Sequence, residues 1–330
     1  MAGRRVLITG VGSFVGGALA RRLERDPEFE AVVGLDTRRP KLELERTELI
    51  EADIRNAVIA RLIPEAEVDT VVHNQIVRRA GPGMSPAAMH DINVIGTLQL
   101  LAACEKSDTI RTIVIRGSAG VYGSEPHAPQ FFTEEMTRLF PLRTRFQRDV
   151  AEIENYFETY SRRHPGVVCT MLRYQPGIGP SLDTQITRYL SLPVVPTYLG
   201  FDPRLQFVHE HDALEALVAA VRNPVRGAVN VACPGTIGLT RMVRLAGRAS
   251  LPIVPSFFDG VTGIGKRLGL LDFSDDFTRL LRHGRATDTT RLVEEVGYQP
   301  RYTTAEAVED YLRTQDGRRV LPNLRQAVTP

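Results

Sequence analysis

The first forty residues constrain the fold of this chain more than any other stretch. An apolar run at 4–9 leads into a glycine-rich turn, TGVGSFVG at 9–16, and residues 13–25 have helical spacing of their apolar side chains. A second apolar run at 31–35 then ends at an acid, Asp36. Glycines let the backbone turn tightly and approach a pyrophosphate, and the helix N-terminus offers free N–H groups. An acid about 20 residues further on can accept hydrogen bonds from the adenosine ribose. This order predicts a dinucleotide-binding βαβ unit.

The residues around Asp36 bear on which dinucleotide binds. Its carboxylate would repel a 2′-phosphate, which favours NAD as the cofactor. Arg38 and Arg39 follow Asp36 and keep NADP open as the lesser alternative, because arginine pairs well with phosphate.

Composition excludes several other classes of protein. The chain has 330 residues, a net charge of +2 and 43% hydrophobic residues, which is typical of a globular protein and gives no indication of nucleic-acid binding. No apolar run approaches the ~20 residues that span a bilayer, and no secretion signal is recognisable. Three scattered cysteines and seven histidines show no ligand spacing. We expect a cytoplasmic protein without a metal site.

Strand-like and helix-like segments alternate along the first two thirds of the chain. The predicted strands after Asp36 are 48–52, 69–73, 110–115, 167–173 and 228–232, and the predicted helices are 55–62, 86–106, 145–163 and 209–221. Such alternation predicts an α/β fold, a doubly wound parallel sheet of the Rossmann type. Ligands bind such sheets at the carboxyl ends of the strands, where Gly10, Asp36, Asp53, His73 and Ser118 would lie along one edge.

The composition of the chain changes after residue 175, where proline and glycine become frequent. We predict that residues 1–175 form the NAD-binding Rossmann domain and that 209–232 return to it. Residues 176–208 and 233–313 would form a smaller C-terminal substrate lobe. Residues 314–330 lack periodicity and are expected to be a tail.

Several motifs together resemble the extended short-chain dehydrogenase/reductase family, in particular its NAD-dependent epimerases and dehydratases, including actinobacterial UDP-glucose 4-epimerase-like proteins. They are TGVGSFVG with Asp36, Asp53-Ile54, VDTVVHNQ at 68–75, NVIGT at 93–97, SAGVYG at 118–123, LRYQPGIGP at 172–180, FVHEHD at 207–212 and the segment 285–300. The resemblance implies cofactor contacts from Gly10, Gly12, Ser13, Phe14, Val15, Gly16, Asp36, Asp53, Ile54, His73, Asn74, Gln75, Asn93, Arg148, Tyr174 and Pro176. It also implies a homodimer through helices 86–106 and 145–163.

The chain departs from this family where its chemistry usually lies. Members carry a Tyr-x-x-x-Lys pair on the second long helix, and none occurs here. Alignment of the helix by Glu152 puts Thr144 at the tyrosine and Arg148 at the lysine. Ser118 is retained, and Tyr122 is a possible substitute acid/base. These four residues, Ser118, Thr144, Arg148 and Tyr122, are the catalytic candidates.

Two smaller departures concern ligand binding. Ser13 stands at the family's middle glycine, and Pro176 stands where sugar-nucleotide epimerases often have an asparagine. Basic residues gather near the expected cleft and would suit a small anionic substrate such as a sugar nucleotide: Arg78, Arg79, Arg116, Arg143, Arg145 and Arg148.

Three functions fit this sequence. The first is an NAD-dependent sugar-nucleotide epimerase or dehydratase that transfers a hydride through bound NAD. The second is a catalytically degenerate NAD(H)-binding sensor or subunit, because the Tyr and Lys are both absent. The third is a reductase of an unknown carbonyl substrate.

Overall fold

A seven-stranded parallel sheet forms the centre of the computed structural model, which describes residues 3–77, 84–258 and 273–314. Its strand order is β11-β6-β5-β4-β1-β2-β3, as expected for a doubly wound sheet. The bounds are β1 Arg4–Thr9, β2 Phe29–Asp36, β3 Thr47–Glu51, β4 Thr70–His73, β5 Thr112–Ser118, β6 Val168–Tyr174 and β11 Gly227–Val231. The predicted fold class is therefore confirmed.

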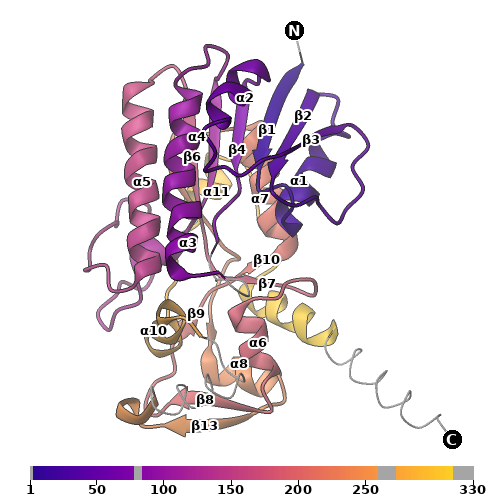
Figure 1. Ribbon diagram of the computed structural model, residues 1–330. Coiled ribbons are helices and arrows are strands. Elements are labelled where there is room, and N and C mark those ends of the chain that lie inside the picture. Colours follow the sequence, from indigo (N-terminus) through magenta and orange to yellow (C-terminus); the bar gives the residue numbers. More distant parts are fainter. Residues whose placement is uncertain (1–2, 78–83, 259–272, 315–330) are drawn as a thin grey trace, which may run out of the picture.

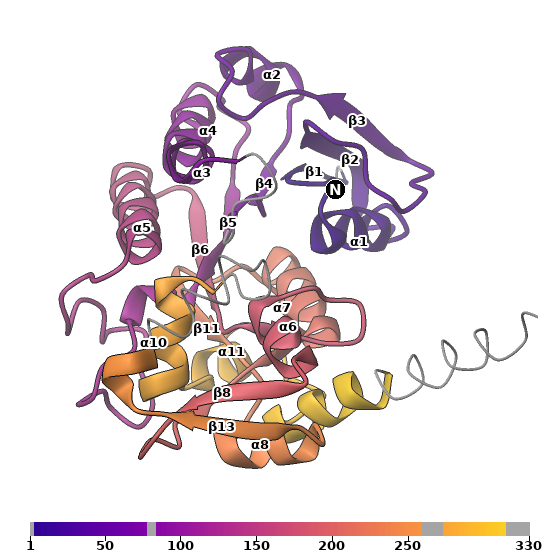
Figure 2. The ribbon, with the colours of Figure 1, turned by 60° about the horizontal axis from the view of Figure 1, so that its bottom comes forward.

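Helices cover both faces of this sheet (Figures 1 and 2). One face carries α2 (Ile59–Glu65), α4 (Gly96–Cys104) and α5 (Arg145–Arg163), and the other carries α1 (Phe14–Leu23) and α7 (Glu210–Arg222). Because apolar layers lie above and below, a central strand such as β4 is buried at every residue. This packing explains the uninterrupted apolar runs in the sequence.

Two helices differ from the expected segments. The expected helix 86–106 contains a π-helical turn (Asp91–Ile95) between α3 (Pro86–His90) and α4, and it ends at Cys104. The predicted helix at 55–62 begins only at Ile59. Asp53 and Asn56 explain the late start, because their side chains accept backbone hydrogen bonds two residues further on and favour turns.

A second hydrophobic core lies below the sheet in Figure 1 and contains buried residues between Ile178 and Tyr311. Its helices include α6 (Gln185–Ser191), α8 (Leu239–Leu245) and α10 (Asp275–His283), and residues 255–258 and 304–314 are also helical. Two longer strands, β8 (Val194–Tyr198) and β13 (Ala249–Ile253), pair in parallel. The remaining short elements are β7 Gly177–Ile178, β9 Arg204–Leu205, β10 Val208–His209, β12 Ile237–Gly238, α11 Thr290–Glu294 and a 3₁₀ turn at Ala119–Tyr122. The domain boundaries given above remain a prediction.

None of the helices in the described part of the chain has both the length and the apolar character needed to cross a membrane.

Candidate functional site

The glycine-rich turn joins β1 to α1 at the carboxyl edge of the sheet. Gly10 has a φ of +72°, which favours glycine, and a Cβ on Gly16 would lie 2.1 Å from the Gly10 carbonyl oxygen. Ser13 caps α1 by accepting a hydrogen bond from the Gly16 N–H. The N–H groups of the following residues, Phe14 and Val15, belong to the first helical turn and have no partner within the helix. The turn is thus a cradle with little room for side chains and with donors for an anion.

Asp36 ends β2 beside this turn. Its carboxylate is buried and accepts the N–H groups of Gly12 at 3.0 Å and Arg38 at 3.1 Å. A small cavity lies against it, lined in part by Arg38, Arg39 and Leu49. The turn and the acid that the sequence singled out are therefore brought together, in an arrangement that fits the adenosine half of a dinucleotide.

Asp53 and Ile54 follow β3 on the same edge of the sheet. Asp53 pairs with Arg55 through two contacts, at 2.9 and 2.6 Å, and the hydrogen bond from Arg55 lowers the pKa of Asp53. Ile54 is buried, and a Cβ on Gly96 would lie 2.7 Å from its side chain. In the structure described, Ile54 is a packing residue and Asp53 is held by its neighbour.

His73 ends β4 and is fully buried between two threonines. Its Nδ1 lies 2.7 Å from the Thr9 hydroxyl, and its Nε2 lies 2.9 Å from the Thr97 hydroxyl. The Thr97 hydroxyl donates to the Asn93 carbonyl, so it accepts from Nε2–H, and Thr9 donates to Nδ1. Desolvation lowers the pKa of His73 to about 4, so the ring is neutral at pH 7.

The pKa of His73 predicts a pH-dependent stability. Its folded value of about 4 lies below the ordinary value of 6.5, so the unfolded chain binds the proton more tightly. Stability should be unaffected by this group above pH 6.5 and should fall as the pH drops toward 4, by a total of about 3 kcal/mol. Urea unfolding at several pH values between 4 and 7.5 gives the free energy of unfolding at each pH and so checks this prediction. In His73→Gln this part of the slope should vanish, and an equal slope in both proteins would contradict the assignment.

Three further expected cofactor residues lie at the ends of β4 and β6 and on the π-helical turn. Asn93 holds the chain after β4, because it accepts the Val77 N–H at 2.7 Å and donates to the Val77 carbonyl at 2.8 Å. Gln75 lies against Gly10, and its Oε1 is buried without a partner among the described residues. The hydroxyl of Tyr174 donates to the Ala213 carbonyl, and its ring lies under the Arg116 guanidinium.

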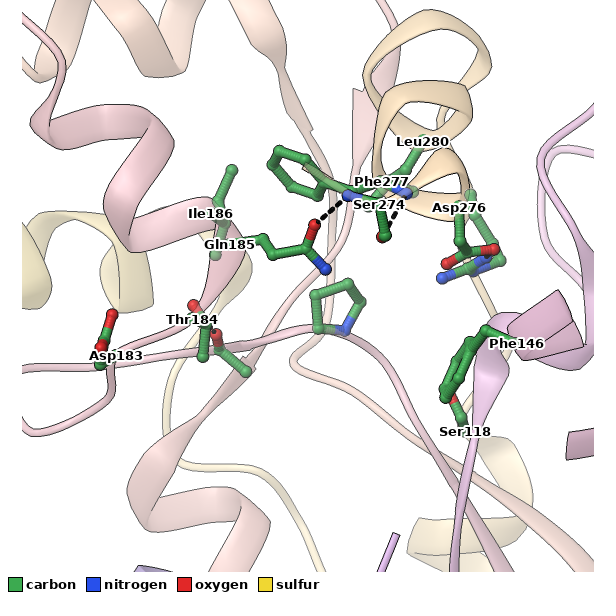
Figure 3. Close-up of a pocket in the computed structure, with 13 residues that line it drawn as sticks. Ser118, Phe146, Asp183, Thr184, Gln185, Ile186, Ser274, Asp276, Phe277 and Leu280 are labelled. Atoms are coloured by element: carbon green, nitrogen blue, oxygen red, sulfur yellow. Dashed lines mark hydrogen bonds and ion pairs between the residues drawn. The ribbon is translucent and has the colours of Figure 1, made fainter. Parts of the chain in front are cut away.

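A cavity of about 180 Å³ lies between the carboxyl end of β5 and the second core (Figure 3). Ser118 and Phe146 form one side, and Figure 3 shows the Phe146 ring beside Ser118. Ser118 Oγ accepts the Gly120 N–H at 3.1 Å, which leaves its O–H free to donate. The other lining residues are Pro176, Gly177, Asp183, Thr184, Gln185, Ile186, Ser274, Asp276, Phe277, Leu280 and Arg285.

Thr144 and Arg148 do not join Ser118 at this cavity. Thr144 is the N-cap of α5 and forms a capping box with Gln147, so its hydroxyl is engaged at the helix end. Arg148 is exposed, and its nearest partners are backbone carbonyls at 3.4 and 3.5 Å. The residue of α5 that faces Ser118 is Phe146, two positions after Thr144, and it has no proton to transfer.

The Tyr122 hydroxyl also points away from Ser118. It donates to Asn230 Oδ1 at 2.7 Å and accepts from Arg173 Nη1 at 2.9 Å. Burial raises the pKa of Tyr122 to about 12. Arg173 in turn forms a buried bidentate ion pair with Glu154, at 2.8 and 2.9 Å. Tyr122 thus belongs to a structural network that joins β5, β6, β11 and α5.

Sequence reasoning missed several of the lining residues, among them the charged pair Asp276 and Arg285. Arg285 is buried and lies 3.8 Å from Asp276 at the edge of the cavity. Gln147 Nε2 donates to Asp276 at 3.3 Å. Asp276 and Arg285 both lie more than a hundred positions beyond Ser118 in the chain, and although Arg285 begins the segment 285–300, that segment gave neither residue a place at this cavity.

The expected gathering of arginines is only partly present. Arg143 pairs with Glu125 at 3.3 Å, Arg145 is exposed, and Arg78 and Arg79 lie outside the described residues. Arg116 lies over Tyr174, and its Nε is buried with no hydrogen-bond partner in the part of the chain that the structure describes. No group of three His, Cys, Asp or Glu side chains in the described ranges could hold a metal ion.

Comparison with known proteins agrees with this geometry. Residues 6–232 match the NAD dependent epimerase/dehydratase family. An uncharacterised protein of Mycobacterium tuberculosis is 40% identical over 319 residues, which cover 93% of this chain and 83% of that protein. The fold is similar to that of a UDP-glucose 4-epimerase from Thermotoga maritima, solved with UDP-glucose, with a TM-score of 0.73, 18% identity and coverage of 95% and 99%. It is also similar to a UDP-glucuronic acid 4-epimerase from Bacillus cereus, in complex with NAD, with a TM-score of 0.69, 18% identity and coverage of 94% and 99%. The match spans more than half of the sequence, and the chain therefore belongs to the NAD-dependent epimerase/dehydratase family.

Proposed function

We propose that this protein binds NAD and transfers a hydride to and from a sugar nucleotide, as an epimerase or dehydratase. The observation that carries the proposal is the position of Ser118. It lines a cavity at the same sheet edge that holds the glycine turn and Asp36. A substrate in this cavity would therefore lie next to a dinucleotide extended along that edge. The solved relatives in which UDP-glucose or NAD is bound share the fold and support the same choice of ligands.

The residues that would hold NAD are those of the turn and of the β2 end. The first-turn N–H groups of Phe14 and Val15 suit the pyrophosphate, and Asp36 suits the adenosine ribose. NAD is preferred over NADP because Asp36 is a buried carboxylate. When bound, NAD supplies the hydride acceptor.

The remaining chemistry needs a group that moves a proton. Asp276 and Asp183 are the carboxylates among the lining residues, and their side chains are 14% and 67% exposed. We assign the transfer of the proton to Asp276, because its side chain is the more shielded of the two. We assign to Ser118 the orientation of a substrate oxygen. Arg285 and Gln147 fix the position of Asp276.

We also propose a homodimer through residues 86–106 and 145–163. Ile95 and Leu98 support this proposal, because these large apolar side chains are 37% and 40% exposed on that helical layer. Sedimentation of the full chain would test it.

Turnover of nucleotide sugars tests the proposed function. The protein would be incubated with NAD and with UDP-glucose, UDP-galactose, UDP-glucuronic acid or dTDP-glucose, while NADH absorbance and the separated sugars are followed. We expect conversion of at least one sugar and a loss of about 10²-fold in Ser118→Ala. Ser250→Ala is the control, since Ser250 is exposed on β13 and does not line the cavity. Binding of NAD without conversion of any nucleotide sugar would overturn the proposal.

A second candidate function is favoured by the residue types that line the cavity. None of the cavity's described lining residues is a Tyr, Lys, His or Cys. A protein that binds NAD(H) without turnover, as a sensor or subunit, would fit this lining. A reductase of a carbonyl compound would instead oxidise NADH when its substrate is present. This net oxidation distinguishes it from the epimerase or dehydratase and from the sensor or subunit.

A further inference from the structure

We infer that Asn74 is a positioning residue for the cofactor, because it holds the Ser13 hydroxyl on the inner side of the glycine turn. The inference rests on the proposed binding of NAD at that turn. Asn74 follows β4, and Ser13 precedes α1, so the contact joins two strands' carboxyl ends across the centre of the sheet. We call this pair the Ser13–Asn74 clamp.

The Ser13 hydroxyl uses all of its hydrogen-bonding capacity within the turn. It donates to the Gly10 carbonyl at 2.8 Å, and it accepts from the Gly16 N–H at 3.1 Å and from Asn74 Nδ2 at 3.0 Å. A hydroxyl has one donor and two acceptor sites, so none remains for a ligand. The hydroxyl is thereby fixed toward the protein and away from the open side of the helix N-terminus.

The orientation of the Asn74 amide follows from its neighbours. Nδ2 lies 3.0 Å from Ser13 Oγ and 3.4 Å from the Gly10 carbonyl oxygen. A flipped amide would place Oδ1 against that carbonyl, where two acceptors repel each other. Asn74 is buried, and a Cβ on Gly16 would lie 2.9 Å from Nδ2, so the third glycine of the turn makes room for the amide.

The clamp accounts for the departure from the family pattern at Ser13. A serine at the middle glycine introduces a hydroxyl where a pyrophosphate must approach the backbone closely. Without Asn74, that hydroxyl could turn outward, release the Gly16 N–H and stand in front of the donors of the first helical turn. Asn74 removes this alternative, and its side chain is needed only because position 13 carries a hydroxyl.

A double-mutant cycle tests the clamp. The chain contains no tryptophan, so the fluorescence of bound NADH can be followed without indole emission from the protein, and its dissociation constant is the readout. We expect Asn74→Ala to weaken NADH binding about tenfold, which is the effect of about 1.4 kcal/mol. In the Ser13→Gly background the same substitution should weaken binding by less than about threefold, because no hydroxyl is left to hold. Asn74→Asp should bind NADH more weakly than Asn74→Ala does, because a carboxylate oxygen would face the Gly10 carbonyl oxygen. Equal losses in both backgrounds, or no loss in Asn74→Ala, would overturn the inference.

Hydrogen exchange separates this inference from the proposed function. Exchange of the amides in residues 10–16, measured by mass spectrometry without cofactor, should be faster in Asn74→Ala than in the wild type. Ser13→Gly and the double variant should exchange alike. If the wild type does not bind NADH, the proposed function fails. If exchange in residues 10–16 is insensitive to Asn74→Ala, the clamp fails even where NADH binds. A melting curve of each variant confirms that it is folded.

Discussion

Arg173→Met is expected to destabilise the protein by about 3–5 kcal/mol, measured as the free energy of unfolding in urea. Arg173 and Glu154 are each 4% exposed, and the guanidinium makes two contacts with the carboxylate, at 2.8 and 2.9 Å. Removal of the cation leaves a buried carboxylate without its partner, which costs far more than the pair contributes. Tyr122 and the Glu134 carbonyl lose their donor as well.

The matched control for this prediction removes both charges. Arg173→Met with Glu154→Leu should recover at least about 1–2 kcal/mol of the loss, because a buried apolar pair can replace a buried ion pair at little cost. An exposed ion pair provides the comparison. Arg25→Met removes the contact between Arg25 and Glu45 and should lower the free energy of unfolding by no more than about 1 kcal/mol. A loss below about 1 kcal/mol in Arg173→Met would show that the network contributes little to stability.

Gly16→Ala is expected to weaken NADH binding by more than about tenfold. The added methyl would lie 2.1 Å from the Gly10 carbonyl oxygen and 2.9 Å from Asn74 Nδ2. Both are fixed groups of the turn, so the turn itself must move to admit a side chain. The N–H groups that would face the pyrophosphate move with it, and fluorescence titration with NADH measures the effect.

Gly17→Ala provides the comparison at the next residue. There the nearest atoms to an added Cβ are at 3.2 and 3.3 Å, which small adjustments can accommodate, and alanine is favoured inside a helix. We expect binding within about threefold of the wild type. Equal binding by Gly16→Ala and the wild type would mean that the turn is not the dinucleotide site.

The fold could be predicted from the sequence because its signals are local and agree with one another. Each strand is an apolar run with a glycine, an acid or a turn after it, and the helix at 145–163 has the bounds expected from its amphipathic spacing. The π-helical turn at 91–95 was not predicted, because its residues continue the apolar pattern of the flanking helices. Within this turn Asn93 bonds the backbone of Val77, a tertiary contact that no local pattern reveals.

The candidate site was less predictable for two physical reasons. Asp276 and Arg285 come from a segment far along the chain, and only the packing of the second core brings them to Ser118. Thr144, by contrast, lies in a local sequence pattern that predicts its role. The sequence Thr-x-x-Gln before an amphipathic helix is typical of a capping box, which already commits this hydroxyl to the helix end. Alignment on Glu152 placed Thr144 at the site, whereas the residue of α5 that faces Ser118 is Phe146, two positions later.

The π-helical turn has a consequence for comparisons among relatives of this protein. A π turn holds one more residue than an α-helical turn, so it acts as a single-residue insertion inside a continuous helix. The two halves of segment 86–106 are therefore out of phase, with His90 bonded to Asp149 on α5 and Gly96 packed on Ile54. A helical wheel drawn through the whole segment would assign one half to the wrong face. An alignment with a relative that lacks the turn needs a one-residue gap here, and without that gap the residues of α4 would be compared about 100° of helical rotation out of register.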